Sequence, residues 1–206
     1  MRLIITRHGE TDYNEKGLMQ PPDAPVLTTL GKEQTRALTK LLAGKGIDII
    51  YCSTLQRAKE TLEIIEEEID ASVIFEPLIV ERDCGIWAGK SVKEFTEYRV
   101  AREETIHEFK PEGGESFVDV RKRAKVFWDK IRDEHADDTV LILTHGAFMR
   151  VLITLIRNWP LERAVDITQD NCCVNEFIVR GDKIKTIRIN YTEHLGSLDR
   201  PVLTKD

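Results

Sequence analysis

Short, mostly apolar runs alternate along the chain with longer amphipathic stretches. Residues 3–5, 47–51 and 140–143 contain few polar positions and show no regular alternation. Runs of this kind are typical of strands that are buried on both faces, as in a parallel sheet. A further short strand is predicted at 73–75, followed by an apolar run at 78–80. We therefore expect a mostly parallel β-sheet.

The stretches between these runs have the spacing of helices with one apolar face. Thr28 is a candidate N-cap for a helix that follows the first loop. Ser53 and Gln56 have the spacing of a capping box, which predicts that a second helix starts at Ser53. Two more helices are predicted, one from about Ser116 and one after His145.

The last part of the chain has the pattern of two antiparallel strands. Residues 173–180 and 183–189 have strand character and flank Gly181 and Asp182, which form a two-residue hairpin signal. The sheet is therefore expected to carry an antiparallel edge. With helices placed between parallel strands, the expected fold class is α/β.

Two segments fit neither a strand nor a strong helix. Residues 9–27 are punctuated by glycine and proline, which predicts a loop. Residues 85–114 hold a mixed-charge stretch that we expect to form a cap-like excursion over a functional site. No internal repeat or interdomain linker is present, so the 206 residues are expected to form one domain, 1–206.

Composition excludes several classes of protein. The formal net charge of −6 gives no general positive field, so neither nucleic acid nor an anionic membrane is an expected partner. No apolar run approaches the roughly 18 residues of a membrane span, and no signal-peptide pattern is present, which favours a cytoplasmic location. The four cysteines lack C-x-x-C spacing and a histidine cluster, so we expect reduced thiols and no metal site.

The predicted strands end at the residues with the most reactive side chains. Arg7 and His8 follow the first strand directly, Arg57 follows the second, and His145 follows the strand at 140–143. Ligands of parallel sheets bind beyond the carboxyl ends of the strands, so these side chains are expected to converge. Two guanidinium groups and two imidazoles suit a phosphate group, because arginine offers paired donors and histidine a neutral nitrogen or a proton.

A carboxyl group is expected beside this phosphate-binding set. Glu81 directly follows the apolar run 78–80 and is a candidate proton donor. Glu10 and Glu76 compete for that role, and the alternative for Glu81 is a surface ion pair of little energetic value. The other histidines lie in polar stretches and are expected to be solvated: His107, His135 and His194.

Several motifs occur together in a fixed order. They are Arg7-His8-Gly9-Glu10-Thr11 with Asn14, Arg57 after Ser53, Glu81 before Gly85-Ile86-Trp87-Ala88-Gly89, Pro111-Glu112-Gly113-Gly114-Glu115-Ser116, and Thr144-His145-Gly146. On these motifs the chain, from residue 2 to about residue 195, resembles the histidine phosphatase superfamily in its phosphoglycerate mutase-like branch. The resemblance implies a three-layer α/β/α fold and a reaction through a phosphohistidine, without a metal ion or cofactor.

The resemblance also implies a role for each reactive residue. Carried over by position, His8 resembles the nucleophile that takes the phosphoryl group. Arg7, Arg57 and His145 resemble the groups that hold its oxygens. Glu81 resembles the residue that protonates the leaving oxygen and later activates water. These roles agree with the chemistry of phosphoryl transfer, which needs an in-line nucleophile, positive charge and a proton for the leaving group.

Asn14, Gln20 and Gly146 are further candidate contacts of the substrate, although Asn14 has the alternative role of turning the loop. Family phosphatases often carry Gly-Arg-x-Gln-Gly after the nucleophile, where this chain has Leu18 and Pro21 around a retained Gln20. Leu18 removes a positive charge and Pro21 removes a backbone donor, so contacts from this loop need not follow the family pattern.

Mutase members carry a longer excursion with an Arg-Arg pair that grips a second anionic group. No such pair occurs between residues 82 and 115. We therefore expect a phosphatase of a small phosphorylated metabolite, since a mutase must retain its product. Phosphoglycerate mutase-type transfer and a non-catalytic scaffold that binds a phosphorylated ligand remain alternatives. The sequence names no substrate, and exposed strand edges and helix faces leave a homodimer open.

Overall fold

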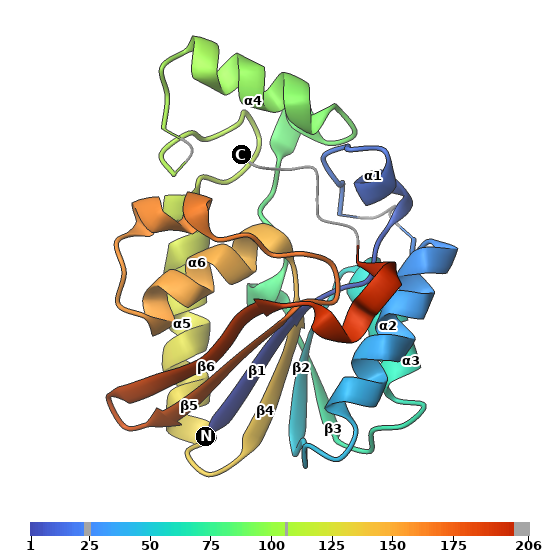
Figure 1. The fold of residues 1–206 in the computed structure, drawn as a ribbon. Coiled ribbons are helices and arrows are strands. Elements are labelled where there is room, and N and C mark those ends of the chain that lie inside the picture. Colours follow the sequence, from blue (N-terminus) through green and yellow to red (C-terminus); the bar gives the residue numbers. More distant parts are fainter. Residues whose placement is uncertain (23–25, 106, 200–206) are drawn as a thin grey trace.

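The computed structural model describes residues 1–22, 26–105 and 107–199, and in them six strands form one sheet in the order β3-β2-β4-β1-β5-β6 (Figure 1). The strands β3, β2, β4 and β1 pair in parallel, whereas β5 pairs antiparallel with β1, and β6 antiparallel with β5. The predicted parallel sheet with an antiparallel edge is confirmed. The strand bounds are β1 (Arg2–Arg7), β2 (Ile49–Ser53), β3 (Ser72–Glu76), β4 (Thr139–Thr144), β5 (Val174–Arg180) and β6 (Lys183–Tyr191).

Helices cover both faces of the sheet, which confirms the three-layer α/β/α fold (Figure 1). Successive residues of β1 point to opposite faces: Leu3 and Ile5 pack with α5 and α6, and Ile4 packs with α2 and α3. None of the described helices is long and apolar enough to cross a membrane. The helix bounds are α2 (Thr29–Leu42), α3 (Gln56–Ile65), α5 (Phe117–Glu134) and α6 (Gly146–Ile156).

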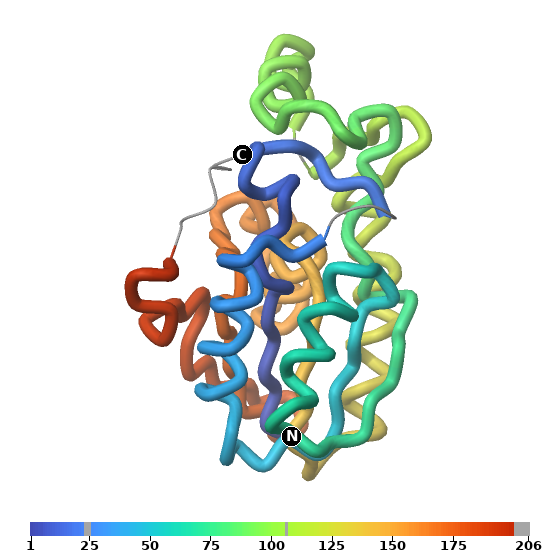
Figure 2. The backbone as a smooth tube through the Cα atoms, turned by 90° about the vertical axis from the view of Figure 1, so that its right-hand side faces the viewer, coloured from blue at the N-terminus to red at the C-terminus, as the bar shows by residue number. Residues whose placement is uncertain are grey.

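The segment between β3 and α5 rises above the carboxyl ends of the parallel strands. Its main helix, α4 (Val92–Ala101), stands apart from the layers that enclose the sheet (Figure 1, Figure 2). The loop after the short helix α1 (Asp12–Glu15) pairs with this segment: the Met19 amide donates to the Lys90 carbonyl, and the Gly89 amide to the Met19 carbonyl, both at 2.8 Å. A separate apolar group, here called the cap cluster, holds the segment together: Cys84, Trp87, Phe95 and Phe109, with Met19 packed against them.

The structure corrects the predicted start of α3. Ser53 is the last residue of β2, and α3 begins at Gln56 after an N-cap position at Leu55 that has no side-chain cap. The Ser53 hydroxyl accepts from the Leu55 amide and also pairs with His145. The Ser-x-x-Gln spacing was therefore misleading as a capping box, because a tertiary partner engages the serine. The predicted cap at Thr28 and the predicted helix from about Ser116 are confirmed, and Ser116 is the N-cap of that helix.

Two smaller predictions concern side chains away from the strand ends. The four cysteines are buried and free, which confirms the prediction of reduced thiols. The prediction of solvated histidines is wrong, since none of the three is exposed. His135 pairs with the Tyr51 hydroxyl and with Asp138, both at 2.8 Å, and His194 stacks on Tyr191. Their polar sequence neighbours did not reveal these tertiary contacts.

The backbone of α2 lies directly against the loop that follows β1. A Cβ atom added to Gly31 would lie 2.0 Å from the Glu10 carbonyl oxygen, and one added to Gly9 would lie 2.5 Å from the Gly31 carbonyl oxygen. No side chain fits between these backbones, so α2 and the loop beside His8 hold each other in place.

We expect Gly31→Ala to lower the free energy of unfolding by about 1–3 kcal/mol, because the new methyl group forces two backbones apart. Helix propensity alone predicts the opposite sign, a gain of up to about 1 kcal/mol for alanine over glycine. Urea unfolding measures the difference, with Lys32→Ala in the same turn as an exposed control. An unchanged or increased stability of Gly31→Ala would contradict the close approach.

Candidate active site

His8 follows the last residue of β1 and is almost fully buried, at 1% exposure. Its Nδ1 lies 2.8 Å from the Gly9 carbonyl oxygen. Since a carbonyl can only accept, Nδ1 carries the proton and Nε2 keeps a free electron pair. Two donors from the 171–172 loop fix the same residue: the Asn171 side-chain amide and the Cys172 backbone amide both reach the His8 carbonyl.

The surroundings of His8 keep its ring neutral. Burial is the main factor that lowers the pKa of His8 well below its ordinary value, and the charges of Arg57 and Arg7 lower it further. The hydrogen bond to the Gly9 carbonyl has the opposite effect and raises the pKa of His8. An unprotonated ring at neutral pH is the form that can act as a nucleophile.

His145 follows β4, the parallel neighbour of β1, and the last pair in their register is Arg7 with Thr144. The centroids of the His8 and His145 rings are 5.2 Å apart. Nε2 of His145 lies 2.7 Å from the Ser53 hydroxyl, and its Nδ1 accepts from Arg57 Nε at 3.2 Å. Burial, followed by the charge of Arg57, lowers the pKa of His145 well below its ordinary value.

The two predicted arginines flank these rings. Arg57 lies in the first turn of α3, is 1% exposed and donates from Nη1 to the Pro21 carbonyl at 3.3 Å. Burial lowers its pKa to about 10, so it stays charged at neutral pH. Arg7 Nη1 donates to the Gln169 carbonyl at 2.8 Å, while Arg7 Nε finds no hydrogen-bond partner among the described residues. A buried donor of this kind suits an anion's oxygen.

Glu81 lies beside the amino terminus of α6. Its carboxylate accepts from the Ala147 and Phe148 amides, at 3.1 Å to Oε1 in both cases, and from the Arg82 amide at 2.9 Å. The competing carboxyls are engaged elsewhere, since Glu10 accepts from the Thr28 hydroxyl and Glu76 pairs with Lys130.

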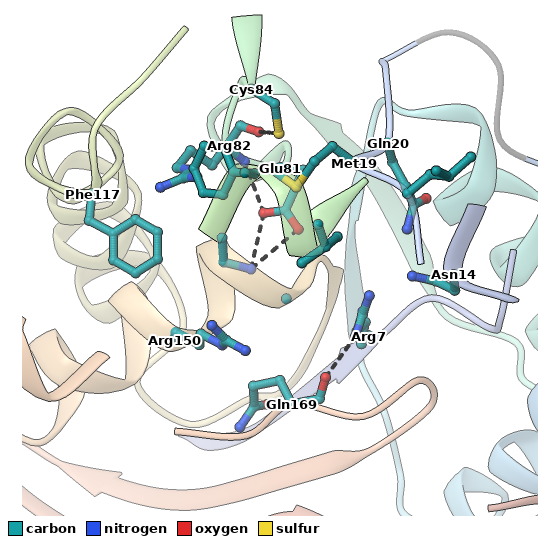
Figure 3. Close-up of a pocket in the computed structure, with 15 residues that line it drawn as sticks. Arg7, Asn14, Met19, Gln20, Glu81, Arg82, Cys84, Phe117, Arg150 and Gln169 are labelled. Carbon is teal, nitrogen blue, oxygen red and sulfur yellow. Dashed lines mark hydrogen bonds between the residues drawn. The ribbon is translucent and has the colours of Figure 1, made fainter. Parts of the chain in front are cut away.

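Neither Glu10 nor Glu76 lines the pocket that Glu81 lines together with Arg7. Figure 3 shows the Glu81 carboxylate and the Arg7 guanidinium directed into that pocket from opposite sides.

Three further predicted contacts also line this part of the molecule: Asn14, Gln20 and Gly146. Asn14 Oδ1 accepts from the Thr11 amide, the Thr11 hydroxyl and the Asn171 side chain, so its amide nitrogen is left to donate. Asn14 thus completes the capping box of α1 with Thr11 and also lines the pocket. A Cβ atom on Gly146 would lie 3.5 Å from Arg7 Cζ, so the Arg7 guanidinium packs against this glycine.

Two more arginines line the pocket, and sequence reasoning missed both. Arg82 is 5% exposed, and its guanidinium lies 4.9 Å from the centroid of Phe117 and 5.3 Å from that of Phe95. Arg150 lies in the second turn of α6 and is directed toward the cavity near Arg7 (Figure 3). A single charged residue inside the mostly apolar run Gly146–Ile156 was the signal that could have identified Arg150.

The neutral histidines predict how stability depends on pH. The unfolded chain protonates these rings near their ordinary pKa of about 6.5, whereas the folded protein does so only at lower pH. The unfolded state therefore binds more protons as the pH falls below about 6.5. Each ring should then lower the free energy of unfolding by up to about 1.4 kcal/mol per pH unit.

Urea unfolding of the wild type and His145→Gln between pH 5 and pH 7.5 tests this dependence. The variant should lose less stability than the wild type on acidification, because it lacks one of the two rings, while its carboxylates are the same. Parallel curves for the two proteins would show that His145 is not held neutral.

Comparison with known proteins agrees with this geometry. The family model of the histidine phosphatase superfamily (branch 1) matches residues 3–192. The chain is 31% identical over 201 residues to phosphoserine phosphatase 1 of Hydrogenobacter thermophilus, covering 95% of each chain. The crystal structure of the α-ribazole phosphatase from Shigella flexneri has a TM-score of 0.84 and 25% identity, covering 93% of this chain and 97% of that one.

A histidine-to-alanine mutant of phosphoserine phosphatase from Entamoeba histolytica, solved in complex with phosphoserine, is also similar. Its TM-score is 0.79 at 25% identity, covering 94% of this chain and 98% of that chain. The similarity to these proteins, in sequence and in fold, therefore extends over nearly the whole chain. The protein belongs to the histidine phosphatase superfamily, branch 1, and is a phosphatase of that superfamily.

Proposed function

We propose that this phosphatase hydrolyses a small phosphate monoester through a phosphohistidine on His8, without a metal ion. The observation that carries the proposal is a buried, neutral His8 whose Nε2 is free while Arg7, Arg57 and His145 surround it. His8 supplies a nucleophile, and the guanidinium groups of Arg7 and Arg57 supply positive charge and donors for the equatorial phosphate oxygens.

In the first step, the electron pair of His8 Nε2 forms a bond to phosphorus and the bond from phosphorus to the ester oxygen breaks. Protonated Glu81 gives its proton to that oxygen, and the alcohol leaves. The positive charge on the His8 ring is stabilised by the Gly9 carbonyl, which accepts from Nδ1 at 2.8 Å. In the second step, Glu81 takes a proton from water, the water oxygen attacks phosphorus, and inorganic phosphate leaves as Nε2 recovers its electron pair.

The pocket supports a substrate that carries a carboxylate beside its phosphate. Arg82 and Arg150 line the same cavity as Arg7, while much of the remaining lining is apolar, including Phe95 and Phe117. The cavity volume is about 120 Å³, which suits a compact substrate. Phosphoserine and phosphoglycerate have this chemistry, and two of the similar proteins are phosphoserine phosphatases.

Phosphoryl transfer between two positions of phosphoglycerate is the second candidate. It is less favoured because the segment 82–115 lacks the adjacent arginine pair associated with mutases. The full set of His8, Arg57, Glu81 and His145 argues against a scaffold that only binds a phosphorylated ligand.

The test is a panel of phosphate esters assayed in a metal chelator, with free phosphate and isomerised product both measured. Phosphoserine should be cleaved with a kcat/KM at least about tenfold above that of phosphoethanolamine, which has the same backbone without the carboxylate. Equal values would remove the carboxylate from the proposal. Isomerised phosphoglycerate without free phosphate would establish the mutase instead.

A further inference from the structure

Arg123, in the second turn of α5, contacts the chain segment that leads into Glu81. Its Nη1 donates to the Leu78 and Val80 carbonyls, both at 2.7 Å, and its Nη2 donates to the Glu81 carbonyl at 3.1 Å. The side chain is 14% exposed. Three carbonyls within four residues therefore depend on one guanidinium group.

The same guanidinium forms a two-bond ion pair with Glu115. Arg123 Nε donates to Glu115 Oε1, and Nη2 to Oε2, both at 3.0 Å. All five N–H donors of Arg123 are thus engaged. Glu115 Oε2 also accepts from the Asp83 amide at 3.1 Å, so the pair holds the backbone on both sides of Glu81 and Arg82.

The carboxylate of Glu81 is held from a different direction. It accepts from the Ala147 and Phe148 amides at the start of α6, and the Arg123 guanidinium lies 5.2 Å from the centroid of the Phe148 ring. The main chain of Glu81 is thus fixed by α5, and its carboxylate by α6. A change in either contact would move the carboxylate relative to His8.

We propose that the Arg123–Glu115 pair is a positioning pair that sets the reach of Glu81 toward the leaving oxygen. This inference rests on the proposed role of Glu81 as proton donor. Proton transfer requires hydrogen-bond distance to the reacting oxygen, and a displacement of about 1 Å can lower a rate by about 100-fold. Lysine cannot replace arginine here, because it has a single nitrogen and no planar fork.

The experiment compares Arg123→Met, Arg123→Lys and Glu115→Gln on an alkyl phosphate, whose leaving oxygen needs a proton, and on p-nitrophenyl phosphate, whose leaving group needs little help. Arg123→Met should lower kcat for the alkyl ester by about 10- to 100-fold and for the aryl ester by less than about threefold. Arg123→Lys should remain defective in the same ratio, and Glu115→Gln should show a smaller loss of the same kind.

The matched control is Arg132→Met, because Arg132 also lies on α5 and pairs with a carboxylate, Asp182, at 2.9 Å. It should leave both activities within about twofold of the wild type. Circular dichroism and thermal melting check that each variant is folded. A purely structural role of Arg123 would lower both activities by the same factor, and full recovery in Arg123→Lys would show that only its charge matters. Either result would overturn the proposal.

The double variant Arg123→Met with Glu81→Gln separates this inference from the proposed function. If Arg123 acts through Glu81, adding Arg123→Met to Glu81→Gln should not change the ratio of alkyl to aryl activity any further. If Glu81→Gln alone leaves that ratio unchanged, the role of Glu81 fails first. If Glu81→Gln changes the ratio and Arg123→Met does not, only the positioning role fails.

Discussion

His8→Ala is expected to lower kcat by about 10⁴-fold or more, because it removes the atom that bonds to phosphorus. Neither of the nearby imidazole nitrogens of His145 can replace it, since one pairs with Ser53 and the other with Arg57. The variant should still bind phosphorylated ligands, because Arg7 and Arg57 remain. Steady-state rates and ligand binding by calorimetry measure the two effects separately.

Rapid quenching in alkaline detergent with a ³²P-labelled substrate provides the second readout for His8, because a phosphohistidine survives in base and is lost in acid. The wild type should carry an acid-labile, base-stable phosphoryl group, and His8→Ala should carry none. His135→Ala is the control, because His135 pairs with Tyr51 away from the pocket. Equal rates in wild type and His8→Ala, or equal labelling of the two, would exclude the proposed nucleophile.

Glu81→Gln should lower kcat for alkyl phosphates by about 10²- to 10³-fold, the range typical of a lost general acid. Glutamine has nearly the same shape, and its oxygen can still accept from the Ala147 and Phe148 amides, so the fold should be kept. For p-nitrophenyl phosphate the first step should be nearly unaffected, since that leaving group departs without a proton. The second step still needs a base, so the phosphorylated protein should accumulate.

A burst of p-nitrophenol followed by slow turnover would report this accumulation. Glu76→Gln is the matched control: Glu76 is also a mostly buried glutamate near the same strand ends, but it pairs with Lys130 and does not line the pocket. An equal loss on alkyl and aryl esters, without a burst, would remove Glu81 from proton transfer.

Much of the fold could be predicted because apolar runs and helix caps depend on residues that are close together in the sequence. The strands at 3–5 and 140–143 are buried on both faces, so they lack alternation and stand out. The predicted cap at Thr28 depends on a hydrogen bond to the amide of Gly31, only three residues away. The convergence of His8, Arg57 and His145 followed from one rule, that parallel strands end at the same edge of the sheet.

The remaining features depend on contacts between distant residues. Ser53 looks like a helix cap in sequence, yet its hydroxyl pairs with His145, 92 residues away. Arg123 looks like one of many charges on a helix, and only the folded chain brings it to the carbonyls before Glu81. Arg82 is buried between two rings supplied by α4 and α5, so its environment cannot be seen from its neighbours along the chain.

The cap cluster is packed separately from the two apolar layers that support the sheet. The proposed phosphate-binding groups Arg7, His8 and His145 lie at the carboxyl ends of β1 and β4, whereas Val92 and Phe95 of α4 form part of the pocket wall. Substitutions in the cap cluster can therefore change which phosphate ester is accepted, while the residues proposed to act on the phosphoryl group stay unchanged. A family built in this way can diversify its metabolic targets without reinventing its chemistry.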